Sequence, residues 1–391
     1  MKIKDAKARV VLNSRGNPTI EVEINGYHEA APEGASKGSN EAKYKEPTEA
    51  VRLFNEELVD FLKTFEIEDL DDLKAFEESF MSIGGIEKYG ANTLIATELA
   101  ILRAWSNYYK EPVYKFFNKH PSVNIRILAN VVGGGAHAKG KSTDIQEFLI
   151  SPRTEDTRVA IFVASYFHKL IAGKLEVLDK SFLYGRNDEG AWTTSLEDFQ
   201  VLALMKSTAE DVKMTYDVEI DIGIDYAANN LYKNGYYVYK NGKFLSREEQ
   251  IEKVIELANF YNLFYIEDPL EENDFEGFSI IRERTSSLIV GDDLTVTNIE
   301  RIKKALENKS IRGVIIKPNQ IGSIVKTYEA VKFCKENGLV PIFSHRSGET
   351  ESGIIAQIAY GMEVPFVKFG ISGGERIAKL NELLRIYENR P

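Results

Sequence analysis

The sequence predicts an α/β fold, in which a closed βα barrel follows a smaller α+β domain. From about Asn124 onward, short apolar runs recur and each is followed by a helical pattern, which is typical of βα units. The charged residues stand at the carboxyl ends of these runs, on the face where βα barrels carry their chemistry. An open doubly wound sheet is the alternative, because it follows the same rule.

The N-terminal part predicts the smaller domain. In TIEVEI (19–24), apolar and acidic residues alternate, which indicates a half-exposed strand. The turn NSRGNPT separates two such runs, and a loop of small residues, APEGASKGSNEA, comes next. Helical patterns follow at 47–65, 69–80 and 91–109. Strands followed by helices favour an α+β unit, so we expect domains at 1–122 and 123–391.

The barrel is predicted from eight strand-like runs. RILANVV (126–132) and QEFLI (146–150) come first, and six later runs end at or beside Asp225, Glu267, Asp292, Lys317, His345 and Lys368. Because these runs are nearly all apolar, we expect a parallel sheet covered by helices on both faces. Capping-box spacing predicts helix starts at Ser246 with Glu249 and at Thr297 with Glu300.

Composition limits the kinds of partner and compartment. The 391 residues carry 49 basic and 60 acidic side chains, a net charge of −11, which argues against broad contact with nucleic acid or an anionic membrane. The single cysteine, Cys334, allows no internal disulfide and fits a reducing compartment. No apolar run approaches the ~20 residues of a membrane span, and no signal segment is recognisable. We therefore expect a cytoplasmic protein.

One stretch matches a nucleotide-binding motif in sequence, but the residues that follow it do not fit the structure that the motif requires. GAHAKGKS (135–142) matches the phosphate-binding P-loop, which would place Lys141 on phosphates and Ser142 on magnesium. A P-loop opens directly into a long helix, whereas TDIQEFLISP follows here and reads as a strand. We therefore set a nucleotidase aside.

Three acids require a partner if the barrel closes. At separations of ~4 Å and an effective dielectric of ~20, each pair among Asp225, Glu267 and Asp292 would cost about 4 kcal/mol. The carboxylates must then bind protons or a cation, and an all-oxygen set with room for water suits Mg²⁺. Each acid alone also fits a charge at a helix start.

Two lysines, Lys317 and Lys368, are expected on the same face. A lysine that is desolvated beside another cation has a lowered pKa and can act as a base; the alternative is an ion pair with one of the acids. A metal and a lysine base together suit removal of a proton from the carbon α to a carboxylate.

At this point the sequence resembles the enolase family. The motifs SRGNP, QEFLISP, NDEG, IEDPL, GDDLTVTN, KPNQIGS and SHRSGETE occur in that order over nearly the whole chain. The resemblance implies a modified TIM-type barrel with a capping domain, and a hydro-lyase of glycolysis. Its reaction would be the reversible dehydration of 2-phosphoglycerate to phosphoenolpyruvate with two Mg²⁺ ions. A lysine base with one or two Mg²⁺ ions is the known pattern of that superfamily's sites.

The resemblance also implies a role for individual residues. Lys317 would remove the C2 proton, and Glu189 would protonate the departing hydroxyl with support from Glu147. Such roles need the pKa of Lys317 lowered and that of Glu189 raised.

The same motifs supply the other site residues. His345 would be a further catalytic residue. The first metal would be bound by Asp225, Glu267 and Asp292, and the second by Ser36. The substrate would be bound by His137, Gln146, Arg346, Ser347 and Lys368.

Several positions depart from the family pattern and keep other functions open. Glu33, Lys37, Ala191 and the stretch 369–372 differ at the loops and the pocket rim. One alternative is a paralogue acting on another carboxylate, and another is a non-catalytic binding protein on the same fold. The intact acids argue against the second, because nothing else calls for their mutual repulsion. The resemblance suggests a homodimer or an assembly of dimers.

Overall fold

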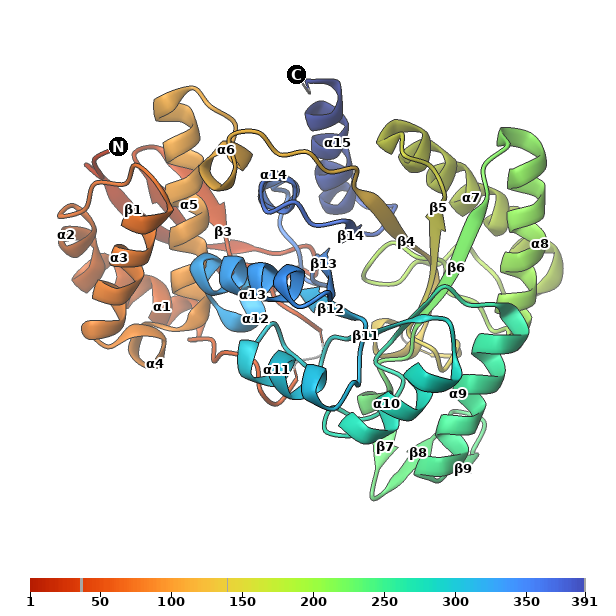
Figure 1. The fold of residues 1–391 in the computed structure, drawn as a ribbon. Coiled ribbons are helices and arrows are strands. Elements are labelled where there is room, and N and C mark those ends of the chain that lie inside the picture. Colours follow the sequence, from red (N-terminus) through yellow and green to blue (C-terminus); the bar gives the residue numbers. More distant parts are fainter. Residues whose placement is uncertain (36–37, 139, 390–391) are drawn as a thin grey trace.

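The computed structural model describes residues 1–35, 38–138 and 140–389. In Figure 1 the red and orange N-terminal elements lie to one side, and the barrel with its helices occupies the rest of the molecule. The chain enters the barrel at Arg126, after an extended stretch that follows the last N-terminal helix.

The N-terminal part is an antiparallel sheet covered by helices. Its strands, in the order β1–β2–β3, are β1 (Ala6–Leu12), β2 (Pro18–Ile24) and β3 (Tyr27–Ala30). Its helices are α1 (Pro47–Leu53), α2 (Val59–Leu62), α3 (Leu70–Ser82), α4 (Gly85–Tyr89), α5 (Ala91–Tyr109) and α6 (Tyr114–Phe117). A π-helical turn at Phe54–Leu58 divides the helix that the pattern predicted over 47–65. Ile20, Val22 and Ile24 are fully buried beneath α5, as the alternation in β2 predicted.

Within the described residues, eight strands close into the predicted barrel. Their order around it is β10–β11–β12–β13–β14–β4–β5–β6. The strands are β4 (Arg126–Gly133), β5 (Glu147–Pro152), β6 (Ile220–Asp225), β10 (Tyr265–Glu267), β11 (Leu288–Gly291), β12 (Gly313–Ile316), β13 (Val340–Ser344) and β14 (Phe366–Lys368). Side chains from seven of these strands fill the interior, including Leu128, Tyr265 and Ile315.

The prediction of a wholly parallel sheet is wrong at one strand. β5 runs antiparallel to both of its neighbours, β4 and β6. A loop without a crossover helix joins β4 to β5, and antiparallel neighbours need no more than that. An apolar run predicts a buried strand whichever way the strand points, so the sequence of β5 could not show that this strand is antiparallel to its neighbours.

Helices cover the outside of the barrel. They are α7 (Thr157–Leu178), α8 (Asp198–Tyr216), α9 (Arg247–Tyr261), α10 (Phe275–Arg284), α11 (Ile299–Glu307), α12 (Pro318–Ile321), α13 (Ile324–Glu336), α14 (Ile354–Gly361) and α15 (Gly374–Glu388). A small sheet of β7 (Tyr232–Lys233), β8 (Tyr236–Val238) and β9 (Phe244–Leu245) projects between β6 and α9.

One of the two predicted helix caps is correct. Ser246 caps α9 with a full capping box to Glu249. The cap expected at Thr297 is wrong, because Asn298 caps α11 instead. Thr297 turns inward, where its hydroxyl accepts the Lys317 N–H and contacts Gln320.

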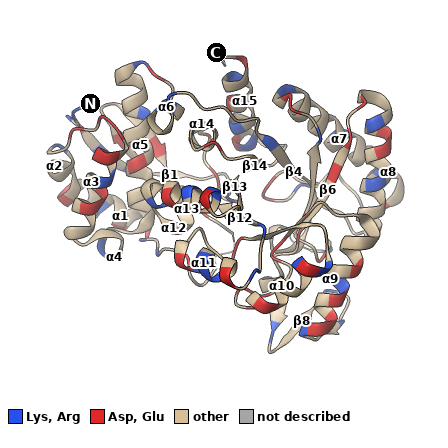
Figure 2. Cartoon of the chain, viewed as in Figure 1, with Lys and Arg blue, Asp and Glu red and all other residues tan. Residues whose placement is uncertain are grey.

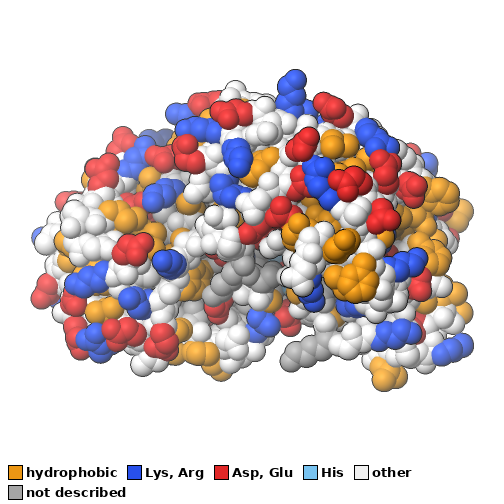
Figure 3. All heavy atoms as spheres, turned by 90° about the horizontal axis from the view of Figure 1, so that it is seen from below, with side chains coloured by type: hydrophobic (Ala, Val, Ile, Leu, Met, Phe, Trp, Pro, Cys, Tyr) orange, Lys and Arg blue, Asp and Glu red, His pale blue; other side chains and the backbone are white. Residues whose placement is uncertain are grey.

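The surface carries both signs of charge. Basic and acidic residues are interspersed along the outer helices in Figure 2, and charged and hydrophobic side chains are intermixed on the face shown in Figure 3. In the described ranges, no helix is both long enough and apolar enough to pass through a membrane.

Buried acids join the N-terminal helices to the barrel. On α5, Glu98 accepts the Ile324 N–H at 2.6 Å, and on α3, Glu77 accepts the Ser323 hydroxyl. Both donors lie at the start of α13, and the Ile324 N–H is one of the first backbone donors that the helix cannot pair internally. Burial, and then Glu77, raise the pKa of Glu98 well above its ordinary value.

Replacing Glu98 with Ala should lower the free energy of unfolding by about 1–3 kcal/mol, because the buried Ile324 N–H loses its acceptor. Denaturant unfolding at pH 5 and pH 8 measures this. The matched Glu98→Gln variant keeps an acceptor and should retain most of the stability.

The same titrations test the protonation of Glu98. Since its pKa is higher in the folded than in the unfolded chain, the folded state binds the proton more tightly, and wild-type stability should fall as the pH rises between the two values. The stability of the Glu98→Gln variant should fall less over the same pH range. A Glu98→Ala variant as stable as wild type would contradict this account of the junction.

Candidate active site

Charged residues from several strand ends meet at one rim of the barrel. Asp225 and Glu267 end the neighbouring strands β6 and β10, where they pair in register. Asp292 follows β11 directly. Lys368, at the end of β14, reaches between them, and its Nζ lies 3.1 Å from Asp225 Oδ2 and 2.8 Å from Glu267 Oε2.

The reversed strand brings a further carboxylate to this rim. Because β5 runs backwards, its first residue, Glu147, stands at the mouth and pairs in register with Asp225. Its Oε2 lies 3.1 Å from Lys368 Nζ. The Lys368 ammonium thus contacts three buried acids from three strands. Lys368 was expected to bind a carboxylate of the substrate, whereas in this structure it binds carboxylates of the protein itself.

Burial makes these charges depend on one another. Burial, and then Asp225, raise the pKa of Glu267 to about 8. Burial, and then Glu189, raise the pKa of Glu147 well above its ordinary value. Burial alone would lower the pKa of Lys368, but Asp225, Glu147 and Glu267 outweigh burial and raise it well above the ordinary value. Protons and lysine ammonium groups together therefore neutralise the acids.

Lys317 takes the other expected arrangement, an ion pair. It follows β12, and its Nζ donates to Asp292 Oδ2, while Gln320 donates to Oδ1 at 2.8 Å. Burial lowers the pKa of Lys317, but the Asp292 charge, with a contribution from Glu267, outweighs burial and raises it. The lowered pKa expected from sequence is wrong for this state, because Asp292 is the closer neighbour.

Glu189 lies in a buried pocket between two histidines. Its Oε2 is 3.4 Å from His345 Nε2 and its Oε1 is 3.7 Å from His137 Nδ1, and Asn130 donates to Oε2 at 3.2 Å. Burial raises its pKa, but His137, His345 and Arg376 outweigh burial and hold it well below the ordinary value. The raised pKa expected for Glu189 is therefore wrong in this state, and the raised pKa belongs to Glu147 instead.

Burial also affects the two histidines beside Glu189. Burial lowers the pKa of both, that of His345 to about 4 with a contribution from Arg376. Arg376 also lies 3.0 Å from His345 Nδ1. An arginine can only donate, so Nδ1 accepts and the ring proton sits on Nε2, facing Glu189.

Arg346 and Ser347, which were expected to bind the substrate, line the same pocket as Lys317 and Lys368. Arg346 is buried and pairs with both oxygens of Glu41, each at 3.0 Å. The Ser347 hydroxyl accepts the Ala35 N–H. Gln146 is buried at the mouth, and its side-chain oxygen has no hydrogen-bond partner among the described residues. Ser36, expected at the second metal, lies outside the described residues.

The sequence reasoning missed several residues that support the site. Glu41 pairs with Arg346, and Gln320 bonds Asp292. Arg376, fully buried, donates to the carbonyls of Arg346, Asp188 and Ser347 and so connects two site loops. Arg376 stands in GGERIAK and Gln320 in KPNQ, but only a folded chain shows what they touch.

The described residues fit a divalent cation. Ligand atoms of Asp268, Asp292 and Asp293 lie within 4.8 Å of one another, as do those of His137, Glu147 and Glu189. Glu267 Oε1 is buried without a hydrogen-bond partner among the described atoms. The carboxylates offer oxygen donors of the kind that Mg²⁺ prefers, whereas His137 would offer a nitrogen. The Lys368 ammonium stands among Asp225, Glu147 and Glu267 as a cation would.

The P-loop interpretation fails on the structure as well. The segment after Ser142 leads into the strand β5, where a nucleotide site would need a helix. The Ser142 hydroxyl is bonded to Lys240.

Comparison with known proteins agrees with this geometry. Residues 3–117 match the family model described as the enolase N-terminal domain, and residues 123–390 match that of the enolase C-terminal TIM barrel domain. The enolase of Methanosphaera stadtmanae is 38% identical over 410 residues, covering 99% of this chain and 97% of that protein. The enolase of Methanocorpusculum labreanum is 39% identical over 403 residues, covering 99% of both chains.

The enolase of Methanothermobacter thermautotrophicus is similar in the same way, with 38% identity over 406 residues, all of this chain and 97% of the other. Both family models and the full-length relatives agree, and the chain therefore belongs to the enolase family.

Proposed function

We propose that this chain catalyses the reversible dehydration of 2-phosphoglycerate to phosphoenolpyruvate, with two Mg²⁺ ions per site. The observation that carries the proposal is the meeting of Asp225, Glu267 and Asp292 with two lysines at one barrel rim. Family membership supports the same reaction. Arg346 beside Ser347 favours a phosphorylated substrate over the carboxylate-only alternative.

Asp225, Glu267 and Asp292 would hold the first cation, and Ser36 the second. When bound, Mg²⁺ stabilises the negative charge that develops on the substrate carboxylate as the C2 proton leaves. The acids are buried and repel one another, so they have little other use. A non-catalytic protein would be more stable without them.

Lys317 would remove the C2 proton at Nζ. In this structure Asp292 raises its pKa. When Asp292 binds a cation instead, Lys317 loses that neighbouring charge, and burial together with Lys368 then favours the neutral amine. The metal ligand and the base are thus linked through one carboxylate.

Glu189 would protonate the departing C3 hydroxyl. Glu147 and Glu189 hold one proton between them, because two buried carboxylates this close do not both ionise readily. Glu147 would carry the proton at rest and Glu189 would deliver it, with His345 beside the pair. The substrate would be bound by His137, Gln146, Arg346, Ser347 and Lys368.

The setting of the reaction follows the same proposal. Residues 1–122 would cap the barrel of residues 123–391. We propose a cytoplasmic enzyme that forms a homodimer or an assembly of dimers. The net charge is −11, and basic and acidic residues are interspersed over the outer helices. This distribution gives no reason to propose a nucleic-acid or membrane partner.

Lys317→Ala should abolish removal of the C2 proton. Exchange of that proton with deuterated water, followed by nuclear magnetic resonance, should fall by about 100- to 10,000-fold, the usual contribution of a general base. Lys332→Ala, the same change on the exposed face of α13, should exchange normally. Rapid exchange in Lys317→Ala would assign the base elsewhere.

Glu189→Gln should separate the two halves of the reaction. Exchange at C2 should continue, while formation of the enol phosphate, followed by its absorbance, should stop because the proton donor is lost. Asp188→Asn changes the neighbouring charge, which pairs with Arg15, and should retain turnover. If Glu189→Gln stopped exchange as well, the assignment of the acid would be wrong.

Mg²⁺ should stabilise the wild-type chain without substrate. At a hundred times the dissociation constant the gain is about 2.7 kcal/mol, seen as a higher unfolding midpoint. Asp225→Asn should lose this gain, and Asp293→Asn should keep it. The reverse result would move the first metal to the cluster of Asp268, Asp292 and Asp293.

A further inference from the structure

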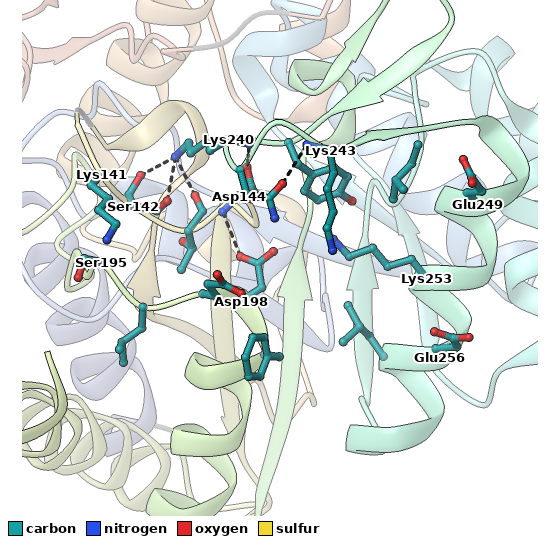
Figure 4. Close-up of a pocket in the computed structure, with 18 of the residues that line it drawn as sticks. Lys141, Ser142, Asp144, Ser195, Asp198, Lys240, Lys243, Glu249, Lys253 and Glu256 are labelled. Atoms are coloured by element: carbon teal, nitrogen blue, oxygen red, sulfur yellow. Dashed lines mark hydrogen bonds between the residues drawn. The ribbon is translucent and has the colours of Figure 1, made fainter.

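A cavity of about 1010 Å³ lies outside the candidate active site, where only about 20 Å³ remains between the side chains. Its walls are the loop 140–144, the start of α8, the hairpin that ends in β9, and α9 (Figure 4). This volume is sufficient for a small organic molecule. The proposed reaction makes no use of the cavity.

Four lysines line this cavity, and none of them forms an ion pair in the described part of the chain: Lys141, Lys240, Lys243 and Lys253. Lys240 donates to oxygens of Ser142 and Thr143. Lys253 Nζ lies 3.5 Å from the centroid of the Tyr239 ring. In Figure 4 the Lys243 and Lys253 side chains extend toward one another. Burial lowers the pKa of Lys253 although the charges of Asp198 and Asp144 oppose that shift, and Lys243 adds a smaller contribution in the same direction as burial.

Carboxylates also line the cavity, and several of them have other partners: Asp144, Glu197, Asp198, Glu248, Glu249, Glu252 and Glu256. Asp198 accepts the N–H groups of Asp144 and Ile145 at 3.0 and 3.2 Å, and Asp144 accepts the Lys240 N–H at 2.8 Å.

Some carboxylates of α9 interact with other groups, and others lie along their own helix. Glu249 completes the cap of α9, and Glu252 pairs with Arg284. Glu249 and Glu256 lie along α9 in Figure 4, whereas Lys253 reaches away from the same helix into the cavity. The Lys243 and Lys253 amines therefore line the cavity without a direct ion pair among the described residues, and Asp198 and Asp144 act on Lys253 only through their charge.

Apolar groups supply the rest of the wall. Leu196 and Phe199 come from the start of α8, Leu245 from β9 and Leu257 from α9. Such a surface suits a planar, uncharged body, and the paired amines suit a dianion.

We propose that this cavity binds a small organic phosphate, with its phosphate or pyrophosphate group between Lys243 and Lys253 and a planar body on the apolar wall. This is not P-loop binding, since Ser142 is bonded to Lys240 and the element that follows the loop is the strand β5, not a helix. The cavity lies behind the loop that carries His137 and Gln146 to the catalytic pocket.

ADP tests the proposal, because it joins a pyrophosphate to a planar ring. Calorimetric titration of the full chain, with a chelator present to exclude metal-dependent binding at the catalytic rim, should detect ADP. The Lys243→Ala/Lys253→Ala double variant should bind it about tenfold more weakly or worse. Adenosine, which lacks the phosphates, should bind the wild type correspondingly weakly.

Lys233→Ala is the matched control, since this exposed lysine belongs to the same small sheet but does not line the cavity. It should bind ADP as wild type does. Circular dichroism and turnover of 2-phosphoglycerate report folding; if the double variant is unfolded, Lys253→Gln alone should still weaken ADP. Absence of ADP binding to wild type, or equal affinity in wild type and a folded cavity variant, would overturn the proposal.

Discussion

The rim of this barrel is organised by one constraint, the mutual repulsion of its buried carboxylates. Asp225, Glu267 and Glu147 lie close together out of water, where like charges cost several kcal/mol per pair. Lys368 stands between them and neutralises part of that charge. The rest is neutralised by protonation, which is why the pKa values of Glu267 and Glu147 rise. At such a rim, a divalent cation would compete with the protons and the lysine ammonium group for the same carboxylates.

The reversed strand β5 is what completes the acidic set. In a uniformly parallel barrel, the residue at the start of a strand lies at the opposite end from the chemistry. Reversal places Glu147 beside Asp225 at the mouth. It also tethers the loop of His137 at both ends to neighbouring strands, since β4 leads into it and β5 leaves it. One irregularity thus supplies both a carboxylate and a loop to the same pocket.

Sequence alone predicted the barrel, its capping partner and the residues that gather at the mouth. Apolar runs ending in charge carry that information, because strand ends in a barrel meet by construction. It could not predict the direction of β5, because an apolar run has no polarity. The pKa shifts of Lys317 and Glu189 were predicted with the wrong sign. Each depends on which neighbour is nearest, and Asp292 lies far from Lys317 in sequence yet bonds its amine. Glu41 was missed for the same reason, since its partner Arg346 comes from the far end of the chain.

The bidentate pairing of Glu41 with Arg346 has a consequence for selectivity. A carboxylate fixed to the same chain acts at a high effective concentration, so any incoming anion must displace it to reach the guanidinium. Chloride or a lone carboxylate gains too little from that exchange, whereas a doubly charged group gains more from the same arginine. If Arg346 binds the substrate as proposed, the tethered acid would set a threshold, and discrimination among anions would come from the cost of removing an internal competitor.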